Sequence, residues 1–115
     1  MIGAEEGDKA ISASLNAFNE KKAAYRCEII ANQAVQEEIT SLLEEKIEGF
    51  QYSVAEQIFG RGLSSRKLGS SVWPEMNFVL TAYVTEEELA EVQAVLESIK
   101  AAFQGEGIQM FAVQV

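Results

Sequence analysis

Residues 25–47 read YRCEIIANQAVQEEITSLLEEKI, and this stretch determines the type of fold. In its first part every second residue is apolar, which predicts a strand from Tyr25 to Ala31 with one buried face. Asn32 follows as a helix N-cap, and apolar residues then recur at helical spacing up to Gly49, where the helix is expected to stop. These helix residues are Val35, Ile39, Leu42, Leu43 and Ile47.

A pair of further strands follows this β-α unit. Gln51 to Phe59 predicts a second strand, and Asn77 to Val84, rich in β-branched and aromatic residues, predicts a third. Pro74 stands just before the third strand because proline does not fit inside a central strand. On the second strand, the expected faces are Tyr52, Val54 and Ile58 on one side, with Ala55 and Phe59 on the other.

The last part of the chain predicts a second helix and a fourth strand. Thr85-Glu86-Glu87-Glu88 has the spacing of a capping box, and its acids favour a helix N-terminus. Gln104-Gly105-Glu106-Gly107 interrupts the helix, and Ile108 to Val115 forms the final strand. The expected buried stripe of the helix is Leu89, Val92, Leu96, Ile99 and Phe103.

The order from Tyr25 onward is therefore β-α-β-β-α-β, which predicts an α+β fold of the ferredoxin-like sandwich type. Both helices of such a sandwich cover the same face of a four-stranded antiparallel sheet. The strands nevertheless carry apolar residues for the second face, which needs cover either from another subunit or from an N-terminal helix. These residues are Ile30, Phe59, Val79, Tyr83, Phe111 and Val113.

Residues 1–24 precede the domain of residues 25–115 as an N-terminal extension. Ile11, Leu15 and Phe18 recur at helical spacing, and Asp8 stands where an N-cap would be, which predicts an extra short helix. A frayed chain end is the alternative interpretation, because terminal segments are commonly unstructured.

Length and charge narrow the classes of function. With 115 residues the chain suffices for one domain, and its net charge of −9 argues against binding of nucleic acid. No apolar run approaches the roughly 20 residues of a membrane-spanning helix, and the N-terminus lacks the basic-then-apolar pattern of a signal peptide. Cys27 is the only cysteine, so no internal disulfide is expected. These properties favour a cytoplasmic protein.

The residues usual in catalysis are largely absent. The sequence has no histidine, which removes the usual general base, the serine and cysteine triads and the Cys/His zinc sites. Cys27, inside an alternating strand, is expected to be a small buried hydrophobe rather than a nucleophile. Glu86, Glu87 and Glu88 are interpreted as a helix start rather than as a cation site. We therefore expect neither an enzyme nor a metal site.

The strongest functional signal is a basic segment in this acidic chain. Residues 57–73 contain no acid, and residues 60–71 read GRGLSSRKLGSS. Glycines allow backbone N–H groups to approach an anion, while serine and arginine side chains add hydrogen-bond donors. The segment is interpreted as a binding loop for an anion or for an acidic partner surface, with a plain solvated hairpin as the alternative. Its candidate ligand-binding residues are Gly60, Arg61, Gly62, Ser64, Arg66 and Lys67.

This arrangement resembles the PII family of signalling proteins, which includes the nitrogen regulators. The resemblance covers residues 25–115, and its most specific parts are FGRG at 59–62, WPEMN at 73–77 and GEG at 105–107. It implies a homotrimer that binds an adenine nucleotide in clefts between subunits and presents the 60–75 loop to a partner protein. It also adds Gly105 and Gly107 to the ligand-binding residues.

The sequence departs from the family pattern in several respects, among them the absence of a tyrosine from the loop and of the arginines that the family carries beyond the last strand. The loop is shorter than in the nitrogen regulators, as in divergent PII-like branches, and residues 104–107 contain an acid and no lysine. Two hypotheses therefore stand. The first is a PII-like regulator of signal transduction that senses a small anionic ligand. The second is a non-catalytic trimeric adaptor, or a protein similar to the CutA proteins, without a nucleotide ligand.

Overall fold

The computed structural model describes residues 22–59 and 76–115. The predicted N-terminal helix and the 60–75 loop lie outside the described residues. The order of the elements confirms the predicted β-α-β-β-α-β sequence. The elements are β1 (Tyr25–Asn32), the 3-10 turn η1 (Gln33–Val35), α2 (Gln36–Lys46), β2 (Ser53–Phe59), β3 (Met76–Val84), α3 (Glu86–Ala102) and β4 (Ile108–Gln114).

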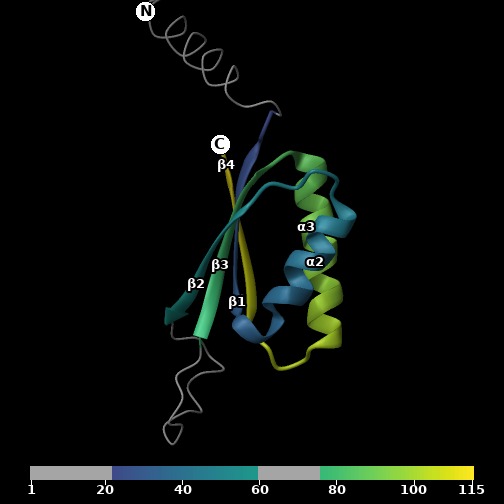
Figure 1. The fold of residues 1–115 in the computed structure, drawn as a ribbon. Coiled ribbons are helices and arrows are strands. Elements are labelled where there is room, and N and C mark those ends of the chain that lie inside the picture. Colours follow the sequence, from purple (N-terminus) through teal and green to yellow (C-terminus); the bar gives the residue numbers. More distant parts are fainter. Residues whose placement is uncertain (1–21, 60–75) are drawn as a thin grey trace, which may run out of the picture.

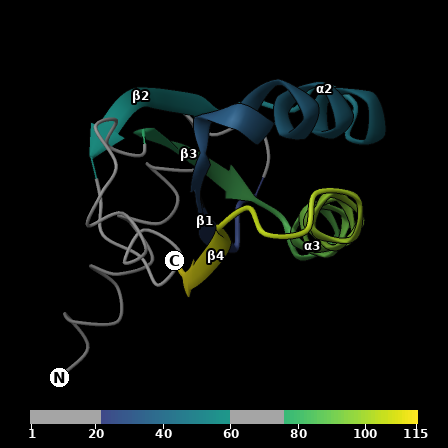
Figure 2. The ribbon, with the colours of Figure 1, turned by 90° about the horizontal axis from the view of Figure 1, so that it is seen from below.

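The four strands form one antiparallel sheet in the order β2-β3-β1-β4 (Figure 1). The two central strands are therefore β3 and β1, whereas β2 and β4 form opposite edges. Both helices lie on the same side of the sheet, as the view along the strands makes clear (Figure 2). This is the predicted ferredoxin-like sandwich, with one face of the sheet covered by α2 and α3.

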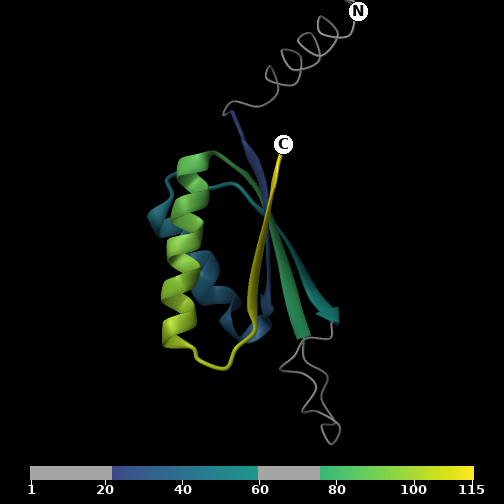
Figure 3. The ribbon, with the colours of Figure 1, turned by 180° about the vertical axis from the view of Figure 1, so that it is seen from behind.

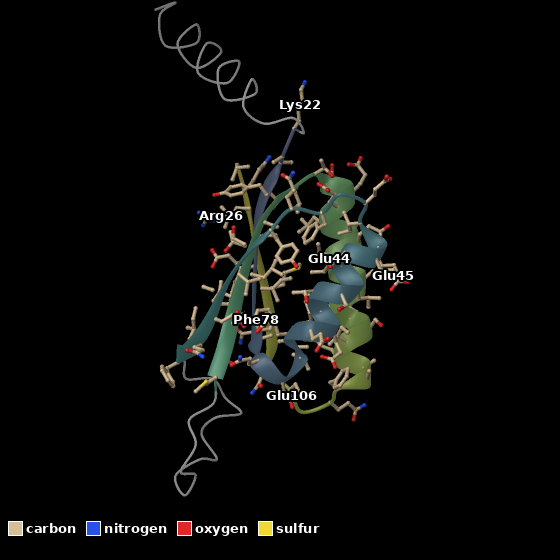
Figure 4. All side chains as sticks on the ribbon, in the orientation of Figure 1. Lys22, Arg26, Glu44, Glu45, Phe78 and Glu106 are labelled. Carbon is tan, nitrogen blue, oxygen red and sulfur yellow. The ribbon has the colours of Figure 1, made fainter. Side chains whose placement is uncertain are left out.

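The core lies between this covered face and the two helices. Every second residue of β1 and of β3 is buried there, as the alternation of apolar residues predicted. Phe78, the largest fully buried side chain, lies on β3 opposite Ala31 of β1 (Figure 4). Burial of each large side chain in this layer stabilises the fold by about 1.5–3 kcal/mol. The fully buried residues include Cys27, Ile29, Val35, Ile39, Leu43, Leu80, Val84 and Val92.

The predicted cap of α3 is confirmed, whereas the predicted cap Asn32 begins the 3-10 turn η1, and α2 itself starts after Val35 without a side-chain cap. Asn32 Oδ1 accepts a hydrogen bond from the Ala34 N–H at 2.8 Å, although the 3-10 turn η1 separates this cap from α2. At α3, Thr85 Oγ1 accepts from the Glu88 N–H at 3.1 Å, and Glu88 Oε1 accepts from the Thr85 N–H at 2.9 Å. This reciprocal pair satisfies two backbone donors that the helix would otherwise leave unpaired. The acids at the start of α3 are thereby explained as helix structure.

The expected faces of β2 are wrong beyond Ala55. Val54 lies opposite Leu80 and Ala55 opposite Val79, but a β-bulge then places Ile58 opposite Asn77 and Phe59 opposite Met76. The extra residue reverses the alternation, because two residues of β2 occupy the space of one on β3. Ile58 therefore shares the uncovered face with Val79. Phe59 belongs to the covered side, but its side chain is 65% exposed.

The expected stripe of α3 is wrong at its last member. α3 ends at Ala102, and Phe103 is the C-cap residue, which leaves its side chain exposed. The other members of the stripe face the core, joined by Val95. Phe103 departs from the core because the chain turns away immediately afterwards through Gly105, whose φ is +95°.

We call the side of the sheet away from the helices the open face. Its apolar residues, placed by the strand register, are Ile30, Ala55, Ile58, Val79, Tyr83, Phe111 and Val113. Three of them are about half exposed, namely Tyr83 at 52%, Phe111 at 53% and Val113 at 50%. Within the described residues, no helix or strand covers this face (Figures 2 and 3). The prediction of a second apolar face is therefore confirmed, except for Phe59.

Candidate functional site

Only two of the predicted ligand-binding residues lie within the described residues. They are Gly105 and Gly107, in the turn between α3 and β4. The other six, Gly60, Arg61, Gly62, Ser64, Arg66 and Lys67, belong to the 60–75 loop, and their role remains a prediction. The positions of Phe59, at the end of β2, and of Met76, at the start of β3, mark where that loop joins the sheet.

The turn of residues 103–107, here called the glycine turn, is shaped by its own backbone hydrogen bonds. The Phe103 N–H donates to the Ile99 carbonyl at 2.8 Å, and the Glu106 N–H donates to the Phe103 carbonyl at 3.3 Å. The φ of +95° at Gly105 lies in a region that residues with a side chain rarely adopt. Both glycines are exposed, so this turn leaves backbone accessible to a bound group.

The glycine turn is connected to the far strands by one row of residues across the sheet. Ile58 of β2 lies opposite Asn77 of β3, and Asn77 lies opposite Asn32 of β1. The Asn32 N–H in turn donates to the Gly107 carbonyl at 3.2 Å. The row therefore ends at the base of the 60–75 loop on one side and at the glycine turn on the other.

The end of β2, where residues 60–75 begin, and the glycine turn lie at the same end of the sheet but at its opposite edges (Figure 3). Strands in a sheet are about 4.8 Å apart, so the three spacings from β2 to β4 separate these two edges by about 14 Å. The two central strands, β3 and β1, lie between these edges.

A shallow hollow between α3 and β4 does not offer an alternative site for the ligand. It encloses about 190 Å³. Ligand pockets usually enclose roughly 300–1,000 Å³, so the hollow is too small for a nucleotide. Its lining residues are Gln93, Leu96, Glu97, Lys100, Ile108 and Met110.

Charges on the described surface are unevenly distributed. The exposed sides of both helices carry acids, among them Glu37, Glu38, Glu44, Glu45, Glu86, Glu87, Glu91 and Glu97. The glycine turn itself contains the half-buried Glu106 (Figure 4). An anionic ligand at this end therefore requires cationic side chains, and the 60–75 loop is the basic segment of the sequence.

Two polar contacts connect α2 with β2. The Tyr52 hydroxyl donates to Glu44 Oε1 at 2.5 Å, and this hydrogen bond is the main reason why the pKa of Tyr52 is raised. Gln36 Nε2 donates to Glu56 Oε2 at 3.1 Å, and Glu56 belongs to the bulge of β2. These contacts hold the strand that leads into the 60–75 loop against the first helix.

The chemistry of Cys27 agrees with its predicted role as a core residue. Burial, with a smaller contribution from Glu28, raises the pKa of the Cys27 thiol to about 11. A thiol is nucleophilic as the thiolate, which is scarce at neutral pH with such a pKa. Among residues 22–59 and 76–115, no cluster of metal-binding side chains occurs. No helix in these two ranges is long and apolar enough to cross a membrane.

The sequence interpretation missed the β-bulge at Glu56 and Gln57. Gln57 has a φ of +56°, a left-handed conformation that is uncommon for residues other than glycine. The available signal was the pair of adjacent polar residues that interrupts the alternation between Val54 and Ile58. The bulge matters for the site because it sets the direction in which β2 enters the loop.

Known structures of the same architecture are PII-like proteins. CPII from Thiomonas intermedia K12, bound to ADP, AMP and bicarbonate, superposes with a TM-score of 0.57 and 20% sequence identity, over 82% of this chain and 93% of CPII. A protein from Thermus thermophilus, described as a PII-like signalling protein, superposes with a TM-score of 0.56 and 19% identity, over 80% and 86% of the two chains.

CPII is similar to this chain in its apo form as well, with a TM-score of 0.55 and 20% identity, over 82% of this chain and 92% of CPII. By sequence, the chain matches no protein-family profile and no curated protein. The chain therefore has the ferredoxin-like fold of PII-like proteins. At this level of identity, the likeness establishes the architecture.

Proposed function

We propose that the protein is a PII-like regulator that binds a small anionic ligand, such as an adenine nucleotide, in clefts between subunits. The observation that carries this proposal is the position of the two candidate segments. The base of the 60–75 loop and the glycine turn lie at one end of the sheet but at opposite edges. We propose that a second copy of the chain, with its β4 edge beside this β2 edge, brings both segments to one ligand.

The comparisons support the class of ligand. CPII, which has the same architecture, has been solved with ADP, AMP and bicarbonate and also with acetate. All of these are anions. In the sequence, Arg61 stands between two glycines directly after β2, and we propose that its guanidinium and neighbouring backbone N–H groups donate to the ligand. Ser64, Arg66, Lys67, Gly105 and Gly107 complete the proposed site.

A homotrimer is the proposed assembly, with the open face as its interface. Tyr83, Phe111 and Val113 expose apolar surface there that association would remove from water. The open face is also nearly free of the acids that cover both helices, so two copies repel each other least on this side. The 60–75 loop, which joins the sheet at its end, then extends from the trimer toward a partner protein.

The proposed role is regulatory and cytoplasmic rather than catalytic. The sequence has no histidine, and the thiol of Cys27 is buried and protonated at neutral pH. In this proposal the ligand is not converted chemically. It acts by changing the conformation of a loop, which is a common means of regulation.

One observation favours the second hypothesis, a trimeric adaptor or CutA-like protein without a nucleotide. Glu106 places a carboxylate in the glycine turn, where the resemblance to PII proteins implies a lysine. A carboxylate at this position repels phosphate groups. The second hypothesis keeps the trimer but leaves the clefts without a nucleotide.

Isothermal titration with ADP, AMP and bicarbonate separates the two hypotheses. Arg61→Ala is expected to weaken binding of the nucleotide by about 1.5–3 kcal/mol, the range for a hydrogen bond to a charged group. The control is Lys46→Ala, which removes the same single positive charge from the last turn of α2. No heat of binding with any of the three ligands, or equal affinities of wild type and Arg61→Ala, contradicts the proposed function.

A further inference from the structure

The open face contains an ion pair in the middle of its apolar residues. Arg26 Nε lies 3.6 Å from Glu28 Oε2, and the strand register places both residues on the side of β1 away from the helices; Arg26 is labelled in Figure 4. Across the register, Arg26 is flanked by Tyr83 and Val113, and Glu28 is flanked by Thr81 and Phe111. The three half-exposed apolar side chains therefore lie directly beside the two charges.

This ion pair is incomplete within one chain. A distance of 3.6 Å exceeds the 2.7–3.2 Å of a good N–H···O hydrogen bond. Arg26 Nε is itself buried and has no hydrogen-bond partner. The two side chains remain 43% and 36% exposed, so each also keeps polar atoms at the surface. Within a single subunit, water hydrates these exposed atoms, whereas Arg26 Nε stays unpaired.

A partner that covers the open face removes this hydration from Arg26 and Glu28. Removal of a charged pair from water costs several kcal/mol per ion unless further hydrogen bonds replace the lost hydration. Apolar cover over Tyr83, Phe111 and Val113 would therefore be opposed by the adjacent charges. A surface that presents one carboxylate and one guanidinium of its own avoids this cost, because it supplies the missing partners.

A second copy of the same chain is such a surface. Among the strand residues that the structure places on the open face, Arg26 and Glu28 are the charged ones, and their charges cancel. The patch is therefore complementary to itself, whereas the glutamates of α2 and α3 make the helix side repel its own copies. Bidentate pairing with a carboxylate is also the contact for which arginine is best suited.

We infer that Arg26 of one subunit pairs with Glu28 of the neighbouring subunit and fixes the register in which the open faces meet. The inference rests on the proposed assembly and adds to it a specific contact and its direction around the ring. The apolar residues supply most of the association energy, while the charge pair excludes other registers and other partners.

The double variant Arg26→Glu/Glu28→Arg tests this contact. It keeps the net charge and the pair within each chain, so folding and self-assembly are retained. In a mixed ring, however, wild-type and swapped subunits place Arg against Arg or Glu against Glu at their contacts. Like charges in an interface cost several kcal/mol, which disfavours mixed species by about a hundredfold or more. Native mass spectrometry of the two proteins, refolded together, should therefore contain only the two homotrimers.

The neutral variant Arg26→Gln/Glu28→Gln is the matched control. It brings no like charges together, so it should form mixed trimers with the wild type in a binomial distribution, which also proves that subunits exchange. The single variants Arg26→Glu and Glu28→Arg give an independent test. Each is expected to be monomeric alone, whereas their mixture forms trimers in which one of the three contacts still joins like charges.

The outcomes distinguish this contact from the assembly itself. A monomeric wild-type protein contradicts the proposed trimer. Wild-type trimers that mix freely with the swapped variant show that Arg26 and Glu28 do not meet across the interface, and the same conclusion follows from a trimeric single variant. A swapped variant that folds but stays monomeric also overturns the inference, since reversal of the pair should be equivalent.

Discussion

Replacing Phe111 by serine is expected to weaken self-association of the protein while leaving the fold of each subunit intact. The Phe111 side chain is 53% exposed on the open face, and a phenylalanine presents roughly 200 Å². About 100 Å² is therefore still available for burial. At about 25 cal/mol per Å², complete cover of this area contributes about 2.5 kcal/mol per subunit, which is an upper bound because the fit is never perfect. Since 1.4 kcal/mol is a factor of ten, this upper bound weakens each contact by up to about 60-fold, and half of it still corresponds to a severalfold rise in the dissociation midpoint.

Sedimentation equilibrium over a dilution series measures this shift. Phe111→Tyr is the control, because it keeps the ring and should leave the midpoint close to that of the wild type. Circular dichroism of Phe111→Ser should match the wild type, since the exposed half of the ring makes no contact with the core. The reasoning is refuted if Phe111→Ser dissociates at the same concentration as Phe111→Tyr, because the open face would then not be an interface.

The remaining predictions concern the stability of the subunit. Thr85→Ala removes the capping box of α3 and should lower the free energy of unfolding by about 1 kcal/mol, whereas Thr85→Ser should retain it; urea denaturation of both measures the difference. Gln57→Val places a β-branched residue at a φ of +56° and should cost roughly 1–2 kcal/mol in the same assay, while Gln57→Gly should be close to neutral; equal stabilities would mean that the left-handed conformation is not maintained in solution. The raised pKa of Cys27, about 11 against an ordinary value of 9.0, means that the folded state favours the neutral thiol. Its contribution to stability is thus complete below pH 9 and declines as the pH rises toward 11, so the wild type should lose stability over this range relative to Cys27→Ala. If the free energies of unfolding of the wild type and Cys27→Ala differ by a constant amount from pH 8 to about 11, the assigned environment of the thiol is contradicted.

The elements whose positions were predicted correctly are those in which local pattern and tertiary environment agree. β1 alternates because one side packs on helices, and both caps use side chains that bond to nearby backbone, so neighbouring residues contain the information. The side of the sheet on which Ile58 and Phe59 lie depends on the bulge that β2 forms where it pairs with β3. Because β3 lies far along the sequence, neighbouring residues do not reveal this bulge. Phe103 has the right spacing for a helix stripe, but the helix ends before it because Gly105 redirects the chain.

The candidate site was predicted only as two separate segments. The basic composition of residues 60–71 and the glycines at 105 and 107 were visible in the sequence. Their relative position was not, because it depends on the strand order β2-β3-β1-β4, which places them at one end but on opposite edges. Composition identified the candidate donors, whereas only the topology shows that the strand leading into residues 60–75 and the glycine turn lie at opposite edges of the sheet.

The position of these two segments on opposite edges has a thermodynamic consequence for the proposed ligand. If each cleft combines the β2 edge of one chain with the β4 edge of the next, separate subunits contain no complete cleft. Binding and assembly are then linked equilibria, and mass action makes each promote the other. The apparent affinity for the ligand should fall as the protein is diluted below its dissociation midpoint. The concentration of the protein in the cell would therefore set the ligand level to which it responds.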